Sequence, residues 1–286
     1  MSHTHLISAD ELKTLQASGA PLLVFDCSGE LGDPAKADAL FADKRIAGAV
    51  QAHLERDLST HDPAHAVNGG RHPLPAREHF AAWLSGIGFD NTMQAVVYDR
   101  NGGNYCGRLW WMLKWAGHDA VAVLDGGLQA WETAGGALES GPAHARPTGS
   151  FQLQPALRRL VRTDEVVQQL GRPTQTLIDA RGAPRYRGEV EPLDPIAGHI
   201  PGALNRPFTD NFGADGRFKP AAQLKAEFDQ LLAGHEPQSV VHHCGSGVSA
   251  VPNLIAMELA GYAPAALYAG SWSEWSRTEG LPVAKG

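Results

Sequence analysis

Short apolar runs alternate along the chain with longer segments in which apolar residues recur at helical spacing. Val24-Phe25-Asp26 and Leu177-Ile178-Asp179 are runs of strand length that end in aspartate, and residues 239–243 form a third strand-like run. Apolar runs of this length are typical of buried strands, whereas the segments between them have the period of helices. The alternation predicts an α/β fold in which each sheet is mostly parallel and has helices on both faces.

The same pattern occurs twice, in the same order. Residues 7–12 resemble residues 161–166, and each predicts a helix that begins at a Ser or Thr cap and has an acidic first turn. Further matches are Ala47-Gly48-Ala49 with Pro201-Gly202-Ala203, Val96-Val97 with Val240-Val241, Gly126 with Gly270, and Trp131 with Trp275. Such a repeat indicates two copies of one fold. We therefore expect tandem domains at 1–138 and 158–286, joined by a linker at 139–157 that is rich in Gly, Pro, Ala and Ser.

Composition excludes several classes of partner. The 286 residues carry a formal net charge of −7, which favours neither nucleic acid nor anionic lipid, and no apolar run approaches the length of a membrane span. Cys27, Cys106 and Cys244 are too few and too scattered for a disulfide framework, which favours a reducing compartment. The N-terminus lacks a secretory pattern, so we expect a cytoplasmic protein. His3 and His5 are isolated, and we expect neither a metal site nor a cofactor.

Cys244 is the strongest candidate for a reactive residue. It follows the strand-like run 239–243 and opens the segment Gly245-Ser246-Gly247-Val248-Ser249-Ala250, which leads into an apolar helical pattern. Small residues allow the backbone to curve so that several N–H groups point inward, and the helix dipole adds to their field. Such a loop stabilises a thiolate, which is the nucleophilic form of cysteine. A buried packing role is the alternative, and a thiol closed off from any opening would contradict the reactive one.

The repeat breaks down at the corresponding position of the first copy. Arg100 stands where the second copy has Cys244, and Cys106, a few residues later, is expected to pack within the following helix. The first copy therefore keeps the fold without the nucleophile. This predicts one active site per chain, in a cleft where the copies meet.

Two other kinds of cysteine enzyme fit the sequence less well. Cysteine phosphatases carry an arginine six residues after the nucleophile, where this chain has Ala250, and without that guanidinium a transferring phosphoryl group lacks its main stabiliser. Papain-like hydrolases remain a minor alternative, because no local signature of that family is present. Sulfur transfer is the chemistry that remains.

Several separated motifs resemble those of the two-domain rhodanese sulfurtransferases, in the order of that family and over nearly the whole chain. They are Cys244-Gly245-Ser246-Gly247-Val248-Ser249, Asp179-Ala180-Arg181 with Arg185-Tyr186, Gly198-His199-Ile200-Pro201-Gly202-Ala203, and Gly270-Ser271-Trp272. The resemblance implies two tandem rhodanese-like domains and a persulfide intermediate on Cys244. A non-catalytic rhodanese-like binding module is the remote alternative, and the intact cysteine argues against it.

Within this family, the loop Cys-Gly-Ser-Gly-Val is similar to that of the 3-mercaptopyruvate sulfurtransferases, and thiosulfate is the alternative donor. The absence of basic residues from the loop favours the monoanionic keto acid over the thiosulfate dianion. The resemblance implies that Gly245, Ser246, Gly247, Val248 and Ser249 bind the donor together with Arg185, whose guanidinium would pair with the donor carboxylate. A surface salt bridge is the alternative role of Arg185.

The chain departs from the family pattern at one place. The family's second substrate arginine is missing where this chain has Glu191-Pro192-Leu193-Asp194. Arg181, Arg187 or Arg206 is expected to compensate.

The resemblance also implies an acid–base relay. Ser246 is expected to help protonate the pyruvate enolate that leaves, with His72 and Asp57 behind it, although either of these two could instead be an ordinary surface residue. The expected sulfur acceptors are cyanide in assays and a thiol such as reduced thioredoxin in cells. Asp26 and Asp179, which end matched strands, are expected to fix turns because both copies have them.

Overall fold

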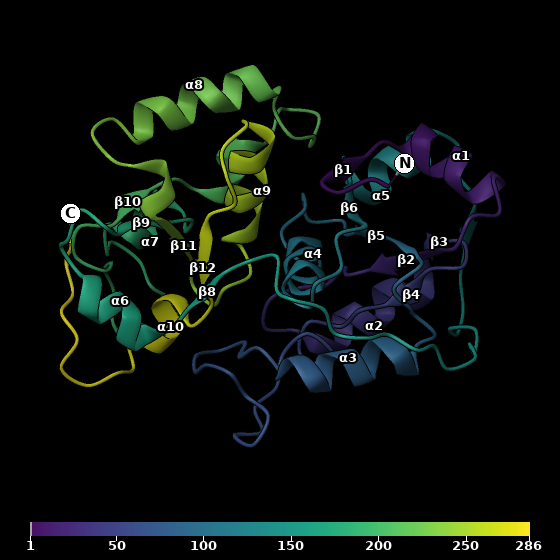
Figure 1. Cartoon of the computed structure of the whole chain (residues 1–286), viewed down its shortest axis with the longest axis horizontal. Coiled ribbons are helices and arrows are strands. Elements are labelled where there is room, and N and C mark those ends of the chain that lie inside the picture. The colour runs from purple at the N-terminus through teal and green to yellow at the C-terminus, as the bar shows by residue number, and fades with distance from the viewer. Residues whose placement is uncertain (1) are drawn as a thin grey trace. The chain divides into compact units, whose positions relative to one another are not determined.

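The computed structural model describes residues 2–286, which form two compact units (Figure 1). Residues 2–65, 75–157 and 214–217 form the first unit, and residues 66–74, 158–213 and 218–286 form the second. The segment 66–74 thus belongs to the second unit although its sequence lies within the first copy of the repeat. This exchange matters for the site, because the segment carries His72.

The first unit is built on a five-stranded parallel sheet in the order β1-β6-β5-β2-β4. Its strands are β1 (Leu6–Ile7), β2 (Leu22–Asp26), β4 (Val50–Gln51), β5 (Gln94–Tyr98) and β6 (Val121–Leu124). A separate antiparallel pair joins β3 (Arg45–Ile46) to β7 (Leu138–Glu139). The sheet is parallel because a helix connects each of its strands to the next.

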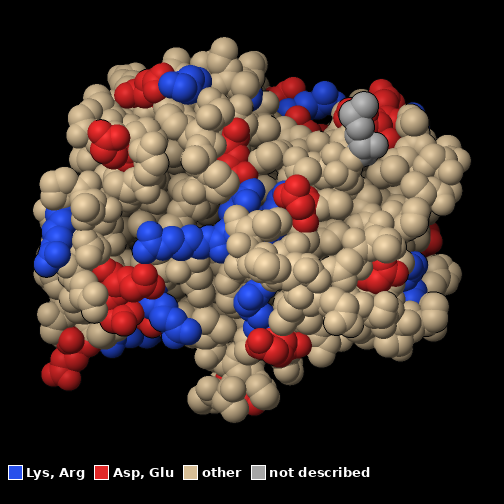
Figure 2. Space-filling view, viewed as in Figure 1, with Lys and Arg blue, Asp and Glu red and all other residues tan. Residues whose placement is uncertain are grey.

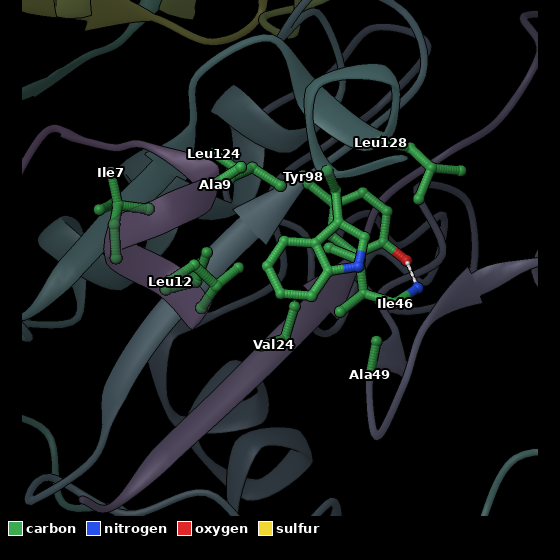
Figure 3. Packing of buried hydrophobic residues seen from close by; sticks show 12 residues of the cluster. Ile7, Ala9, Leu12, Val24, Ile46, Ala49, Tyr98, Leu124 and Leu128 are labelled. Atoms are coloured by element: carbon green, nitrogen blue, oxygen red, sulfur yellow. Dashed lines mark hydrogen bonds between the residues drawn. The ribbon is translucent and has the colours of Figure 1, made fainter. Parts of the chain in front are cut away.

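Helices cover both faces of this sheet. They are α1 (Ala9–Ala17), α2 (Pro34–Asp43), α3 (Arg77–Gly86), α4 (Cys106–Trp115) and α5 (Gly127–Thr133). Leu12 of α1 and Trp131 of α5 are buried against Val24 and Val96 on one face, in the core that Figure 3 shows. On the other face, Phe25 packs its ring against Trp83 of α3. The alternation of inward and outward side chains along β2 therefore supplies both cores.

The second unit repeats this arrangement. Its parallel sheet has the order β10-β9-β11-β12-β8, which matches the first sheet strand for strand. The strands are β8 (Leu160–Val161), β9 (Thr176–Asp179), β10 (Leu204–Asn205), β11 (Val240–His243) and β12 (Ala266–Tyr268). The prediction of two copies of one α/β fold is confirmed.

Helices also lie on both faces of the second sheet. They are α6 (Thr163–Gln169), α7 (Ala183–Tyr186), α8 (Ala221–Leu231), α9 (Val251–Leu259) and α10 (Ser271–Trp275), with 3-10 turns η1 (Phe208–Asn211) and η2 (Pro237–Ser239). Val166 of α6 and Trp272 of α10 share one core with Val241. On the opposite face, His242 points toward Met257 of α9. Figure 1 shows α8 and α9 across the sheet from α6 and α10.

The two predicted helix caps differ. Ser8 caps α1 with a complete capping box, in which Ser8 N–H donates to Glu11 and Glu11 N–H donates to Ser8 Oγ. In the second copy the N-cap is Arg162, so the prediction of a Thr163 cap was wrong. Thr163 lies inside the helix, where its hydroxyl instead bonds to the Tyr268 hydroxyl at 2.9 Å.

Within residues 2–286, no helix has the length and apolar character that crossing a bilayer requires. On the face that Figure 2 shows, basic side chains lie interspersed with acidic ones.

Candidate active site

The loop that follows β11, residues 244–250 (the Cys244 loop), is held through its first two carbonyls. Cys244 C=O accepts from Trp272 N–H at 3.0 Å, and Gly245 C=O accepts from Ser273 N–H at 2.8 Å. The backbone N–H of Cys244 donates to Ser271 Oγ at 3.1 Å. The start of α10 therefore fixes the start of the loop. Ser271 adopts a left-handed backbone conformation, with φ of 55°, while holding this contact.

Five other backbone N–H groups of the loop have no protein partner within residues 2–286. Among the residues that the structure describes, the backbone N–H groups of Gly245, Ser246, Val248, Ser249 and Ala250 donate to no acceptor. Buried N–H groups are nearly always paired, so several unpaired ones in one loop are suited to hold negative charge. That they point toward the Cys244 sulfur, as expected from the sequence, stays a prediction.

Gly247 is required by the curvature of the loop. Its φ is +73°, and a Cβ atom at this position would lie 2.4 Å from the carbonyl oxygen of Ala269. Only glycine satisfies both the left-handed backbone and the close approach of the strand end. The loop is therefore shaped by contact with the segment that joins β12 to α10.

Cys244 itself is almost covered, with 1% of its surface exposed. The opening on which the sequence-based hypothesis depends is thus nearly closed in this structure. The Arg71 and Arg185 side chains beside the loop are each 21% exposed. Access to the Cys244 sulfur from solvent therefore requires side chains around the loop to move.

Ser246 and His72 form a direct contact. His72 Nδ1 lies 2.7 Å from Ser246 Oγ, and both residues are buried. The segment 66–74 brings His72 to this place, because Val67 N–H donates to Leu74 C=O and Arg71 N–H donates to Ser273 Oγ. The structure thus brings together the hydroxyl and the imidazole that the resemblance implied. Their catalytic roles stay a prediction.

Asp57 lies in the first unit. Its carboxylate accepts a hydrogen bond from His53 N–H at 2.8 Å and lies 3.5 Å from Arg56 Nε. Burial raises the pKa of Asp57, against the opposing effect of these two partners. The role of Asp57 in a relay stays a prediction.

Arg185 lies beside the Cys244 loop within a cluster of charged side chains. Its Nη2 donates to Glu191 Oε1 at 2.6 Å and lies 3.4 Å from Asp194 Oδ2. Asp194, whose carboxylate is fully buried, also accepts from Arg71 and, at 2.7 Å, from Arg277. We call these five side chains the arginine cluster. Glu191 and Asp194, which the sequence marked as a departure from the family, are its acidic members.

Arg71 is the residue that sequence reasoning missed. A methyl group placed on Gly245 would lie 2.9 Å from Arg71 Nη2 and 3.6 Å from Arg185 Nη1, so both guanidinium groups flank the residue after the nucleophile. The available signal was its position directly before His72, the relay candidate. A residue adjacent to a site residue is brought to the same region of the fold.

Of the three arginines proposed as substitutes, only Arg181 contacts a member of the arginine cluster in the part of the chain that the structure describes. Arg181 is buried, pairs with Asp179 at 2.6 Å, lies over the Trp272 ring, and places Nη1 3.3 Å from Glu191 Oε2. Arg206 pairs with Glu227, and Arg187 is exposed and pairs with Glu189. Within residues 2–286, none of the three forms a hydrogen bond or ion pair with the Cys244 loop. That one of them replaces the missing arginine stays a prediction.

Asp26 and Asp179 act as the sequence predicted. Asp26 Oδ1 accepts from Ser28 N–H at 2.8 Å, and Asp179 Oδ1 accepts from Arg181 N–H at 2.9 Å. Each carboxylate therefore fixes the turn that follows its strand.

In the equivalent loop of the first unit, backbone N–H groups are bound by the Asp99 carboxylate. Asp99 Oδ1 accepts from the N–H groups of Asn101 and Gly103, and Asp99 Oδ2 accepts from those of Tyr105 and Cys106. Arg100, at the place of the nucleophile, donates to Leu40 C=O and Lys44 C=O. The N–H groups of this loop are thus already paired with a fixed negative charge, and Cys106 is buried at the start of α4 as predicted.

His242 and His243 precede the nucleophile and are fully buried in the sheet. Burial lowers the pKa of both, that of His242 to about 3, so both rings are neutral at neutral pH. Neither histidine therefore brings a positive charge to the loop.

Comparison with known proteins places these features in a family context. The model of the rhodanese-like domain matches residues 8–134 and 162–278. A protein of Pseudomonas aeruginosa named "Probable 3-mercaptopyruvate sulfurtransferase" is 47% identical over the full length of both chains. A "Putative thiosulfate sulfurtransferase SseB" of Mycobacterium tuberculosis is 38% identical and covers 98% of this chain and 97% of its own. The crystal structure of SseA from Escherichia coli, described under 3-mercaptopyruvate sulfotransferases, has a TM-score of 0.79 and 30% identity, covering 95% of this chain and 100% of its own.

Proposed function

The chain belongs to the rhodanese-like family, and on that premise we propose that it is a sulfurtransferase that moves sulfur from 3-mercaptopyruvate through a persulfide on Cys244. The observation that carries the proposal is the Cys244 loop, in which five of the backbone N–H groups after the cysteine have no protein partner in the described chain. Burial of a charge is costly, and these dipoles offset that cost for a thiolate.

The first half-reaction forms one S–S bond and breaks one C–S bond. The Cys244 thiolate attacks the thiol sulfur of 3-mercaptopyruvate, and the electron pair of the C–S bond leaves with the carbon as the enolate of pyruvate. The Cys244 persulfide keeps the hydrogen that the donor thiol carried. A proton then goes to the enolate carbon, and it is the proton that the Cys244 thiol gave up to become a thiolate.

Ser246 and His72 are the proposed carriers of that proton. Their contact at 2.7 Å allows the imidazole to hold the cysteine proton and return it through the hydroxyl. We include Asp57 as the third member of the relay. An Asp57→Asn variant that keeps the wild-type kcat with 3-mercaptopyruvate would remove it from the mechanism.

The second half-reaction releases the sulfur. An acceptor thiolate or cyanide attacks the outer persulfide sulfur, the S–S bond breaks, and the Cys244 thiolate is regenerated. We propose that the cellular acceptor is a reduced thiol protein such as thioredoxin, in the cytoplasm, which agrees with the three cysteines Cys27, Cys106 and Cys244 being free. Turnover sustained by reduced thioredoxin, and fractionation of cells, test these two points.

Mass spectrometry tests the covalent step. After incubation with 3-mercaptopyruvate and without acceptor, Cys244 should gain the mass of one sulfur atom, and Cys244→Ser should lose both this adduct and turnover. Cys27→Ser is the matched control, because Cys27 is another buried free cysteine and should leave both intact. Full turnover of the Cys244→Ser protein would disprove the mechanism.

Thiosulfate is the second candidate donor, and the name of the Mycobacterium tuberculosis relative favours it. The loop itself offers a thiosulfate dianion backbone dipoles and the hydroxyls of Ser246 and Ser249, and no charged side chain. Measuring kcat/KM for both donors with cyanide as the common acceptor decides between them. We expect 3-mercaptopyruvate to be preferred, and a higher kcat/KM for thiosulfate would overturn this choice.

A further inference from the structure

We propose that Arg71 and Arg185 together bind the donor carboxylate, with Arg71 serving as the second arginine of the donor site; this inference rests on the proposed function. Arg71 Nη2 and Arg185 Nη1 both flank Gly245, the residue next to the nucleophile. An anion between these two groups would lie beside the residue that follows the attacking cysteine.

Both guanidinium groups have N–H donors beside Gly245 that are not used by the protein. Arg71 uses Nη1 on Asp194, and its Nε is buried without a partner. Arg185 uses Nε and Nη2 on Glu191 and Asp194. Within the described chain, Arg71 Nη2 and Arg185 Nη1 donate to no acceptor. A carboxylate between them would accept one hydrogen bond from each arginine.

The balance of charge also favours a monoanion. In the arginine cluster, the three guanidinium groups of Arg71, Arg185 and Arg277 face the two carboxylates of Glu191 and Asp194. One positive charge is in excess, and the ion pair of Arg181 with Asp179 leaves this excess unchanged. One donor carboxylate would neutralise it, whereas a thiosulfate dianion would leave a net negative charge in a partly buried place.

Asp194 is a positioning residue for Arg71. The Asp194 carboxylate is fully buried. One of its oxygens accepts from Arg71, and the other lies near Arg185. The segment 66–74 therefore delivers two groups at once, His72 to Ser246 and Arg71 to Gly245. An acid–base partner and an anion-binding group on adjacent residues are fixed by the same backbone contacts.

Kinetics of Arg71 variants test the inference. Loss of a charge-assisted hydrogen bond to the donor should raise KM for 3-mercaptopyruvate about tenfold or more in Arg71→Gln, with kcat close to that of the wild type. Arg71→Lys, which keeps the charge without the planar fork, should give an intermediate KM. Arg159→Gln is the matched control, because Arg159 is an exposed arginine of the same unit that pairs with Glu165 outside the arginine cluster; its KM should stay at the wild-type value.

Binding of pyruvate to the Cys244→Ser protein gives a readout that does not depend on turnover. By calorimetry, the added Arg71→Gln change should weaken pyruvate binding about tenfold, and an added Arg159→Gln change should leave it unaltered. The inference would be overturned, with sulfur transfer left intact, if Arg71→Gln changed neither the pyruvate affinity of the Cys244→Ser protein nor the KM of the active enzyme. A wild-type protein that binds pyruvate through Arg71 but transfers no sulfur would instead overturn the proposed function. If Arg71→Gln does not fold, Arg71→Lys decides, since an unchanged KM there overturns the role of the arginine.

Discussion

His72 Nδ1 lies 2.7 Å from Ser246 Oγ, two residues beyond the candidate nucleophile. Both side chains are buried, so the contact is shielded from exchange with bulk water. The buried His72–Ser246 pair can therefore hold a proton without losing it to solvent. An enolate leaving group requires such a proton at its carbon.

This contact predicts a donor-dependent effect of mutation. With 3-mercaptopyruvate the leaving group is an enolate whose carbon must be protonated, so Ser246→Ala and His72→Asn should each lower kcat roughly a hundredfold. With thiosulfate the leaving group is sulfite, which departs without protonation at carbon. Steady-state rates with both donors measure the difference.

The thiosulfate rate of the same variants is the internal control. It should stay close to its wild-type value, whatever that value is. An equal loss with both donors would mean that Ser246 and His72 shape the loop and do not move a proton.

The Asp99 carboxylate predicts that the first unit cannot be activated by restoring a cysteine. In a protein carrying Arg100→Cys and Cys244→Ser, the N–H groups that would stabilise a thiolate at position 100 are already bound to Asp99. We expect no turnover and no sulfur adduct at position 100 by mass spectrometry. Arg100→Ala with Cys244 intact is the control and should keep turnover. An adduct at position 100 would show that the pairing with Asp99 is not what silences this loop.

The repeat made much of the fold predictable from the sequence. Strand-length runs such as Val24-Phe25-Asp26 occur in both copies with helical patterns between them, and parallel sheets follow from that order. The Cys244 loop was equally visible, because its glycines and serines are adjacent in sequence. Local patterns thus predicted the elements and marked Cys244 as the candidate nucleophile.

The arginine cluster was not predictable in the same way. Arg71 and Asp194 are far apart in the sequence, and their contact depends on the segment 66–74 joining the second unit. No periodicity marks that exchange. The expectation that Arg181, Arg187 or Arg206 would compensate did not consider Arg71, although a buried carboxylate pairs with whichever arginine the fold brings to it. The Thr163 cap failed for a similar reason, because the Tyr268 hydroxyl offered Thr163 a tertiary partner.

Substitution of Gly247 should affect both turnover and stability, and Gly261 offers a comparison. Gly247→Ala places a Cβ 2.4 Å from Ala269 C=O at a φ of +73°, so the loop must move and its N–H groups with it. We expect a large loss of turnover and a loss of about 2 kcal/mol or more in the free energy of unfolding. Gly261→Ala has a similar φ of +89° with nothing within 4 Å of the new Cβ. It should cost about 1 kcal/mol and leave turnover unchanged. Equal turnover in the two variants would show that loop shape does not govern the reaction.

The burial of His242 predicts that stability falls in mild acid. Its pKa is about 3 in the folded protein, because burial disfavours the charged ring, and about 6.5 in an unfolded chain. The unfolded state therefore binds more protons between these two values. The stabilisation is complete above about pH 6.5 and is lost progressively as the pH falls toward 3. At pH 5 the loss from His242 alone should be about 2 kcal/mol, and His243, whose pKa is also lowered by burial, should add to it.

Urea unfolding measured from pH 7 to pH 5 tests this linkage. His242→Leu keeps a side chain of similar size without the titrating ring, so its free energy of unfolding should fall less steeply with decreasing pH than that of the wild type. Met257→Leu is the control, since it removes the sulfur that lies 3.0 Å from His242 Nε2 but leaves the ring buried. It should keep the wild-type slope. Parallel slopes for wild type and His242→Leu would mean that groups other than this histidine set the acid sensitivity of the second unit.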